Sequence, residues 1–73
     1  MDSGQILRVV LKEHKISVRK IARTTGIDLH YFYKYISSNP QTRVVMSADR
    51  LQEIVRALPD PAQKDFFKSF VSD

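Results

Sequence analysis

The chain has 73 residues, less than one average domain, so a single domain with one core, spanning residues 1–73, is expected. It contains no cysteine, which excludes a disulfide framework and a thiolate metal site and favours a reducing compartment. Hydrophobic residues make up 42% and charged residues 27%, an ordinary globular composition that argues against disorder. The sequence shows neither an apolar stretch near the ~20 residues of a membrane span nor a secretory signal, so we expect a soluble, cytoplasmic protein.

Positive charge is concentrated in the first part of the chain, although the net charge is only +4. Residues 1–43 hold eight basic and three acidic side chains, whereas residues 44–73 hold four basic and five acidic ones. A basic front half on a near-neutral back half is typical of a phosphate-facing surface backed by a packing or assembly element. An imbalance of this size is also compatible with an ordinary solvated surface.

The two glycines and three prolines separate long segments able to form helices. Apolar residues at helical spacing predict a first helix over residues 4–14. Ser17 is a good N-cap for a short second helix, and Gly26 suits the position after it, where φ is positive. Asp28 can cap a third helix that runs from residue 29 to about 38 and ends before Pro40.

The second half of the chain predicts two more helices. Ser47 can cap a fourth helix whose apolar residues recur at i, i+3, i+4 and i+7 from Leu51 to Leu58. Asp60 as cap with Pro61 at the first helical position begins a fifth helix that extends to about residue 71. No strand pattern is longer than residues 43–46, so an all-α chain follows.

Residues 17–36, SVRKIARTTGIDLHYFYKYI, have the spacing of a helix-turn-helix unit. Ala22 is small where the following helix must cross close to it, and four residues later Gly26 allows the sharp turn. Apolar residues that include Phe32 and Ile36, six and ten positions after Gly26, fill the angle between the two helices.

This stretch resembles the helix-turn-helix of the XRE family, the lambda Cro and phage-repressor-like DNA-binding domains, and the resemblance extends more loosely over residues 4–71. It implies an all-α fold, a compact five-helix bundle with the helix-turn-helix at helices two and three. It also implies a small, repressor-like transcriptional regulator that binds double-stranded DNA sequence-specifically. The helix over about residues 29–38 would then lie in the major groove.

The resemblance assigns base reading to four positions of the third helix, namely Asp28, Leu29, His30 and Lys34. On a helical wheel, His30, Lys34 and Ser37 point away from the apolar stripe, so periodicity selects the same face. Lys34 suits guanine O6 and N7, His30 a purine acceptor or a phosphate, and Leu29 a thymine methyl. Asp28 fits a plain N-cap better than a reader of cytosine.

Phosphate contacts are expected at the start of the second helix. Arg19 and Lys20 lie in its first turn, where the macrodipole disfavours each positive charge by roughly 0.3 to 1 kcal/mol, and this placement suggests a phosphate ligand. Arg23 and Arg43 are further phosphate candidates or merely solvated charges, and two tyrosine hydroxyls flank the groove face. The full expected set is Ser17, Arg19, Lys20, Arg23, Tyr31, Tyr33, Ser37 and Arg43.

Two features depart from the family pattern. Val18 stands where many members have a glutamine that holds a phosphate, which puts that contact in doubt. Leu11 and Ile36 stand where an Arg and a Glu often pair. Well-packed apolar groups can replace a buried ion pair at little cost, so the fold is unaffected, but a phosphate contact at Leu11 is lost.

The fifth helix has a broad apolar face with three phenylalanines, more than a domain of this size is expected to cover alone. We predict a two-fold homodimer joined through this helix, with interface residues Phe66, Phe67, Phe70 and Val71. A dimer would set its recognition helices about 34 Å apart on a pseudo-palindromic site. Alternatively, all three rings close the base of the monomer core.

No catalytic constellation is present, so an enzyme is not expected, and nothing points to a cofactor or a small-molecule ligand. His14 and His30 are too few and too far apart to suggest a metal site. The alternative function is a protein-binding module of the same fold, antitoxin-like or anti-repressor, without specific DNA contact. Val18, Leu11 and the low net charge favour it, whereas the basic residues on the expected DNA side oppose it. A third possibility is the amino-terminal domain of a longer regulator.

Overall fold

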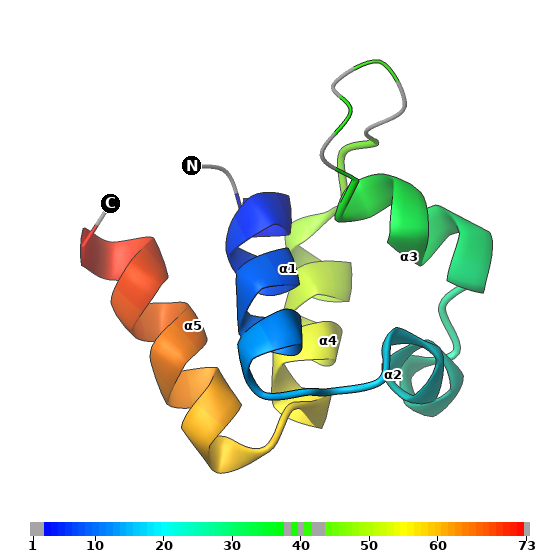
Figure 1. Cartoon of the computed structure of the whole chain (residues 1–73). Helices are drawn as coiled ribbons and strands as arrows, with labels where there is room; N and C mark the ends of the chain where they lie inside the picture. The colour runs from blue at the N-terminus through cyan, green and yellow to red at the C-terminus, as the bar shows by residue number, and fades with distance from the viewer. Residues whose placement is uncertain (1–2, 38, 40, 42–43, 73) are drawn as a thin grey trace.

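The protein is described by a computed structural model over residues 3–37, 39, 41 and 44–72. Within these residues it forms five α-helices and no strand, which confirms the all-α five-helix bundle (Figure 1). The helices are α1 (Ser3–Glu13), α2 (Val18–Thr25), α3 (Leu29–Tyr35), α4 (Ala48–Ala57) and α5 (Asp60–Ser72). In the described part of the chain, no helix is long and apolar enough to cross a membrane.

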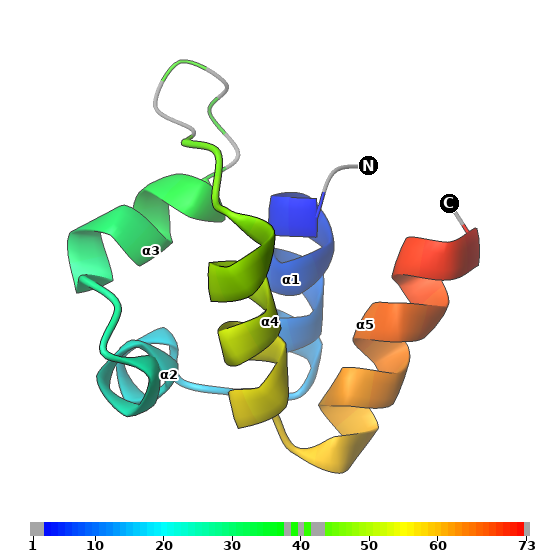
Figure 2. The ribbon, with the colours of Figure 1, turned by 180° about the vertical axis from the view of Figure 1, so that it is seen from behind.

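The helices form two groups. α1, α4 and α5 run side by side, and α5 packs against both of the others. α2 packs against α3 and α4, so the α2–α3 pair lies on the side of the molecule opposite α5 (Figure 2). The α2–α3 pair, which carries basic side chains, and α5, which carries three phenylalanines, therefore lie at opposite ends of the molecule.

α1 ends in a Schellman motif centred on Lys15. The Lys15 backbone has φ 53°, the left-handed conformation that usually requires glycine. The N–H of Lys15 donates to the Lys12 carbonyl at 3.2 Å, and the N–H of Ile16 donates to the Leu11 carbonyl at 2.9 Å. Half-buried Ile16 packs against the core, which holds this turn in place although lysine is a poor residue for it.

α2 begins and ends where its cap residues predict. The Ser17 hydroxyl accepts the N–H of Lys20 at 3.2 Å, and Gly26 after the helix has φ 72°. The N–H of Ile27 donates to the Ala22 carbonyl at 3.1 Å, the six-to-one bond that closes a second Schellman motif. These local bonds turn the chain sharply from α2 into α3.

α3 is shorter than the predicted 29–38, because it ends at Tyr35. The N–H of Ser37 reaches the Lys34 carbonyl at 3.4 Å, an i to i−3 bond that tightens the chain after the last helical turn. Ser37, expected on the exposed face of α3, therefore lies just beyond the helix and is half-buried.

α4 and α5 meet at a tight corner that a glutamine closes. The side-chain amide of Gln63 donates to the Leu58 carbonyl at 2.8 Å and to the Arg56 carbonyl at 3.3 Å, satisfying groups at the end of α4. The N–H of Gln63 also donates to the Pro59 carbonyl at 2.9 Å, so α5 includes Asp60 and begins one residue earlier than predicted.

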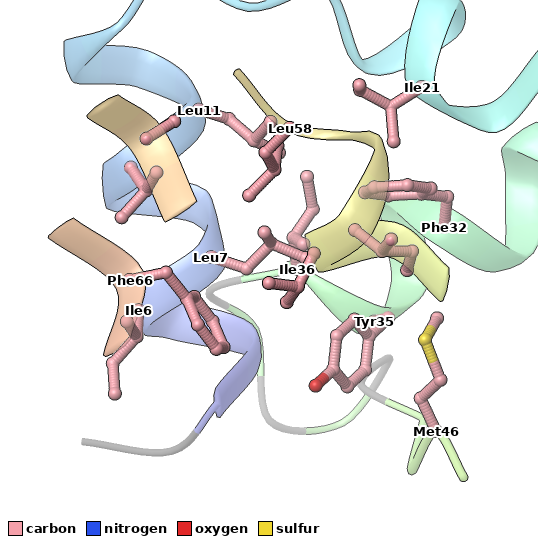
Figure 3. Packing of buried hydrophobic residues seen from close by; sticks show 14 of the residues in the cluster. Ile6, Leu7, Leu11, Ile21, Phe32, Tyr35, Ile36, Met46, Leu58 and Phe66 are labelled. Carbon is pink, nitrogen blue, oxygen red and sulfur yellow. The ribbon is translucent and has the colours of Figure 1, made fainter. Parts of the chain in front are cut away.

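The core lies where the two groups of helices meet (Figure 3). Its largest fully buried side chains are Leu7 of α1, Phe32 of α3 and Ile54 of α4. No charged residue is buried among the described residues, and the core is apolar apart from the hydroxyl of Tyr35, which lies 2.5 Å from the hydroxyl of Ser3 in a hydrogen bond. A polar contact at the surface links the end of α1 to α5. Nε2 of His14, the residue after α1, lies 2.6 Å from Oδ2 of Asp65 in α5.

Candidate nucleic-acid interface

The α2–α3 unit has the packing that its spacing predicts. Ala22 is 4% exposed and lies at the base of the turn, where its small side chain admits the following helix. Ile27 after the turn and Phe32 and Ile36 from the third segment are also buried in the core. This packing fixes the rotation of α3 about its own axis and thereby decides which of its side chains face solvent.

The exposed face of α3 carries His30, Tyr33 and Lys34. Of the four residues expected to read bases, Asp28 is exposed as well, but its carboxylate accepts the N–H of Tyr31 at 3.0 Å as the N-cap. Leu29 is half-buried and packs against the core, so only part of its side chain is accessible. His30 and Lys34 are thus the long polar side chains that this face presents to a ligand.

The first half of α2 carries three exposed basic side chains. Arg19 and Lys20 are exposed, and so is Arg23 one turn later. None of these three side chains forms an ion pair with a carboxylate within the part of the chain that the structure describes. The Ser17 hydroxyl uses its lone pairs to accept the Lys20 N–H and keeps its own proton available for a donor bond.

The two tyrosines that flank this face differ in their surroundings. Tyr33 is 50% exposed and its hydroxyl has no hydrogen-bond partner among the described residues. The hydroxyl of Tyr31, which is half-buried, donates to the Val45 carbonyl at 3.0 Å. A phenol carries one proton, so Tyr31 would have to leave this carbonyl before it donated to a phosphate. Arg43, also expected at phosphates, lies outside the described residues.

An open concavity of about 550 Å³ adjoins the start of α3, and sequence reasoning missed one of its residues. Its lining includes Asp28 and Tyr31 together with Arg50 from the first turn of α4. The exposed Arg50 side chain adds a positive charge near the start of α3. Arg50 and Asp28 are far apart in the sequence, so no local pattern predicts that they lie close together. The packing of the bundle brings them together.

The residues expected at a dimer interface divide into two kinds. Phe67 and Phe70 are 53% and 51% exposed, and Val71 is 81% exposed. Phe66 is 3% exposed and belongs to the core. The physical reason is its place on the side of α5 that turns toward the interior.

Among the described residues, no group of three His, Cys, Asp or Glu side chains is placed to hold a metal ion. What the α2–α3 end does offer is a rigid helix face bearing hydrogen-bond donors, flanked by cations.

Comparison with known proteins found no matching family model, no matching curated protein and no matching solved structure. A functional assignment therefore has to come from the residues and geometry of this chain.

Proposed function

We propose that the protein is a small, repressor-like transcriptional regulator of XRE type that binds double-stranded DNA sequence-specifically and acts in the cytoplasm on the nucleoid. The observation that carries the proposal is the orientation of α3. Its buried Phe32 anchors the helix, while His30 and Lys34 are exposed, and the first turn of α2, the helix that packs against α3, carries exposed cations. A helix of this kind fits the major groove, which is about 12 Å wide.

Base reading is assigned to the outward face of α3. Lys34 can donate to O6 and N7 of a guanine, and His30, four residues earlier on the same face, can donate to a purine acceptor. Because Phe32 is fully buried, α3 cannot rotate without breaking the core, so both side chains leave the helix on the same exposed face. A donor that meets the wrong base edge is left unpaired, and that cost discriminates between base pairs.

Phosphate binding is assigned to exposed cations of α2 and α4. Arg19 and Lys20 extend from the amino-terminal turn of α2, whose backbone N–H groups favour an anion. Arg50, in the first turn of α4, lines the same concavity as Asp28 and Tyr31. Each phosphate neutralised releases counterions, so the logarithm of the binding constant should fall with the logarithm of the salt concentration by about 0.9 per contact.

The test is selection of bound duplexes from a random pool at about 150 mM salt, followed by binding to the selected duplex. Lys34→Ala should lose about 1 to 3 kcal/mol on that duplex and relax the preference for one base pair. Arg19→Ala should weaken binding to all duplexes and lower the salt slope by about one. Lys64→Ala removes the same charge as Lys34→Ala from an exposed site on α5 and is the control, with no effect expected. Failure to enrich any duplex, or equal losses for both lysine variants, would refute the proposal.

A second candidate function is a protein-binding module of the same fold. The observation that favours it is the pair of half-exposed rings Phe67 and Phe70 on α5, away from the α2–α3 unit. On this alternative the α2–α3 cations serve only solubility. It predicts that no duplex is enriched and that Arg19→Ala changes no binding property.

A further inference from the structure

A groove of about 390 Å³ lies between α4 and α5. Its lining is mainly apolar, with Leu51 and Val55 from α4 and Phe67 and Phe70 from α5. Within the described part of the chain, the α2–α3 unit contributes no residue to this lining. Sites for small molecules are concave, mostly apolar and about 300 to 1,000 Å³ in volume, so this groove has the size and character of a small one.

The aromatic rings of the groove are held by the core. Phe66, which also lines the groove, is 3% exposed and belongs to the core cluster. The ring of Phe70 stacks on it, with centroids 6.0 Å apart and 18° between the planes. The ring of Phe67 meets it edge to face, at 5.9 Å and 79°. Because both outer rings rest on a buried one, the aromatic wall of the groove is formed before any ligand arrives.

The corner between α4 and α5 places a cation at one end of the groove. The Gln63 side-chain amide donates to the Arg56 carbonyl at 3.3 Å, so both residues lie at this corner, and both line the groove. The Arg56 side chain is exposed, and its guanidinium forms no hydrogen bond or ion pair with another described residue. Its N–H donors are therefore available to an anion.

Arg56 is the one charged side chain among the described residues that line the groove. Glu53, one turn earlier on α4, borders a separate hollow together with Arg56, but the two form no ion pair. The groove thus combines an apolar lining with a single positive charge that no contact neutralises. This combination is complementary to a molecule with one negative charge and an apolar body.

We propose that the groove binds a small amphipathic carboxylate, in which one carboxylate group is joined to an aliphatic or aromatic body. The carboxylate pairs with the Arg56 guanidinium, whose planar array of donors matches its two oxygens. The apolar body lies between Leu51 and Val55 on one side and the rings of Phe67 and Phe70 on the other. An uncharged molecule of the same shape gains no ion pair, and a cationic one is repelled.

The length of the groove selects the probe. Its α4 lining extends from Ala48 to Arg56, which is about 12 Å at the rise of a helix. Extended octanoate has a comparable length and carries one carboxylate. The groove lies at the surface, and Phe67 and Phe70 are about half exposed, so a bound ligand stays partly in water. A dissociation constant on the order of 1 mM is therefore expected for octanoate.

Titration of the whole chain with sodium octanoate, followed by amide chemical shifts in NMR spectra, tests the proposal. The shifts should saturate and should be largest in α4 and α5. Arg56→Gln should weaken octanoate binding about fivefold to tenfold and leave the binding of octan-1-ol unchanged, because only the acid uses the guanidinium. Lys64→Gln removes the same charge from an exposed position of α5 outside the groove lining, and it is the control with no effect expected.

A second variant tests the apolar part of the site. Phe70→Ser should weaken the binding of both octanoate and octan-1-ol, since the stacked ring contacts the body that the two molecules share. Thermal melting of Arg56→Gln and Phe70→Ser checks that both variants fold. A loss for octanoate alone would show that the acid does not lie against this ring and would overturn the proposed placement.

Three other outcomes would overturn the proposal. The first is the absence of saturable shifts in α4 and α5 up to about 10 mM octanoate. The second is equal affinity of the wild type and Arg56→Gln for octanoate. The third is a wild-type dimer in sedimentation equilibrium that Phe70→Ser converts to a monomer, because a second copy then covers the groove.

The carboxylate site does not rest on the proposed DNA function. α5 and the α2–α3 pair lie on opposite sides of α1 and α4 (Figures 1 and 2). Arg19→Ala should therefore lose duplex binding and keep octanoate binding, whereas Arg56→Gln should do the reverse. Failure of one proposal is thus visible separately from failure of the other.

Discussion

Replacing Phe32 by alanine should remove much of the stability of this domain while the adjacent Tyr33→Ala should not. Phe32 has no exposed surface and is the largest fully buried side chain, whereas Tyr33 is 50% exposed. Phe32 belongs to the core cluster that also contains Ile21 of α2 and Ile54 of α4, so it helps to hold three helices together. Its removal both exposes apolar surface on its partners and leaves a cavity.

The free energy of unfolding lost by Phe32→Ala can be bounded from the burial of this residue. Truncation of a fully buried phenylalanine costs about 3 to 5 kcal/mol. A chain of 73 residues has a free energy of unfolding of about 4 to 11 kcal/mol, so the substitution removes between about a quarter of the stability and all of it. Because 1 kcal/mol shifts the melting temperature of a domain this small by about 4 to 8 °C, the expected decrease is about 12 to 40 °C.

Thermal and urea unfolding followed by circular dichroism measure both variants. Tyr33→Ala should change the free energy of unfolding by less than about 1 kcal/mol, because a half-exposed ring loses little burial and alanine is a better helix former. Equal losses for the two variants, or a near-native melt of Phe32→Ala, would mean that α3 is rotated differently about its axis. The assignment of His30 and Lys34 to the DNA side would then be wrong as well.

Three further predictions concern the turns and the polar contacts. Lys15→Gly should stabilise the domain by about 0.5 to 1 kcal/mol, since it relieves a left-handed backbone. Gly26→Ala should destabilise the domain by about 1 to 2 kcal/mol. The cause is backbone strain alone, because Gly26 has positive φ and an added Cβ would meet no atom within 4 Å. Urea unfolding measures both variants, and a change of the same sign for Lys15→Gly and Gly26→Ala would contradict this geometry. The side chains of His14 and Asp65 are 26% and 50% exposed. A double-mutant cycle on these two residues should give a coupling free energy of about 0.2 to 1 kcal/mol in stability. A coupling of zero would show that the contact does not persist in solution. Tyr31→Phe should cost less than about 1 kcal/mol of stability and leave duplex affinity unchanged, so a tenfold loss of affinity would place that hydroxyl on a phosphate instead.

The sequence by itself determined the number, order and approximate ends of the helices. The caps at Ser17 and Ser47 are bonds to an N–H three residues on, and the turn at Gly26 needs only a residue that tolerates positive φ. Such interactions are complete within one turn of helix, so local residue types specify them. The sequence also predicted which face of α3 points inward. Helical periodicity places Phe32 on one face and His30 and Lys34 on the opposite face, whatever the buried face packs against.

Only the tertiary structure decided how neighbouring apolar residues of one helix are used. Phe66 and Phe67 are the same residue type at adjacent positions, and periodicity places both on the broad apolar side of α5. The packing of α5 against α1 and α4 buries the first to 3% exposure and leaves the second at 53%. The angle and distance at which helices pack depend on side chains from all of them, so no single segment contains this information.

The polar pairings between helices have the same origin. The hydrogen-bonded pairs are Tyr31 with Val45, 14 positions apart, and His14 with Asp65, 51 positions apart. Arg50 lies beside the start of α3. No local sequence pattern relates the partners in any of these contacts. Each forms because the packed bundle brings together segments that are distant in the sequence. Short-range hydrogen bonding and periodicity thus set the elements of this protein, whereas burial of a shared core set which surface residues meet and which side chains remain for a ligand.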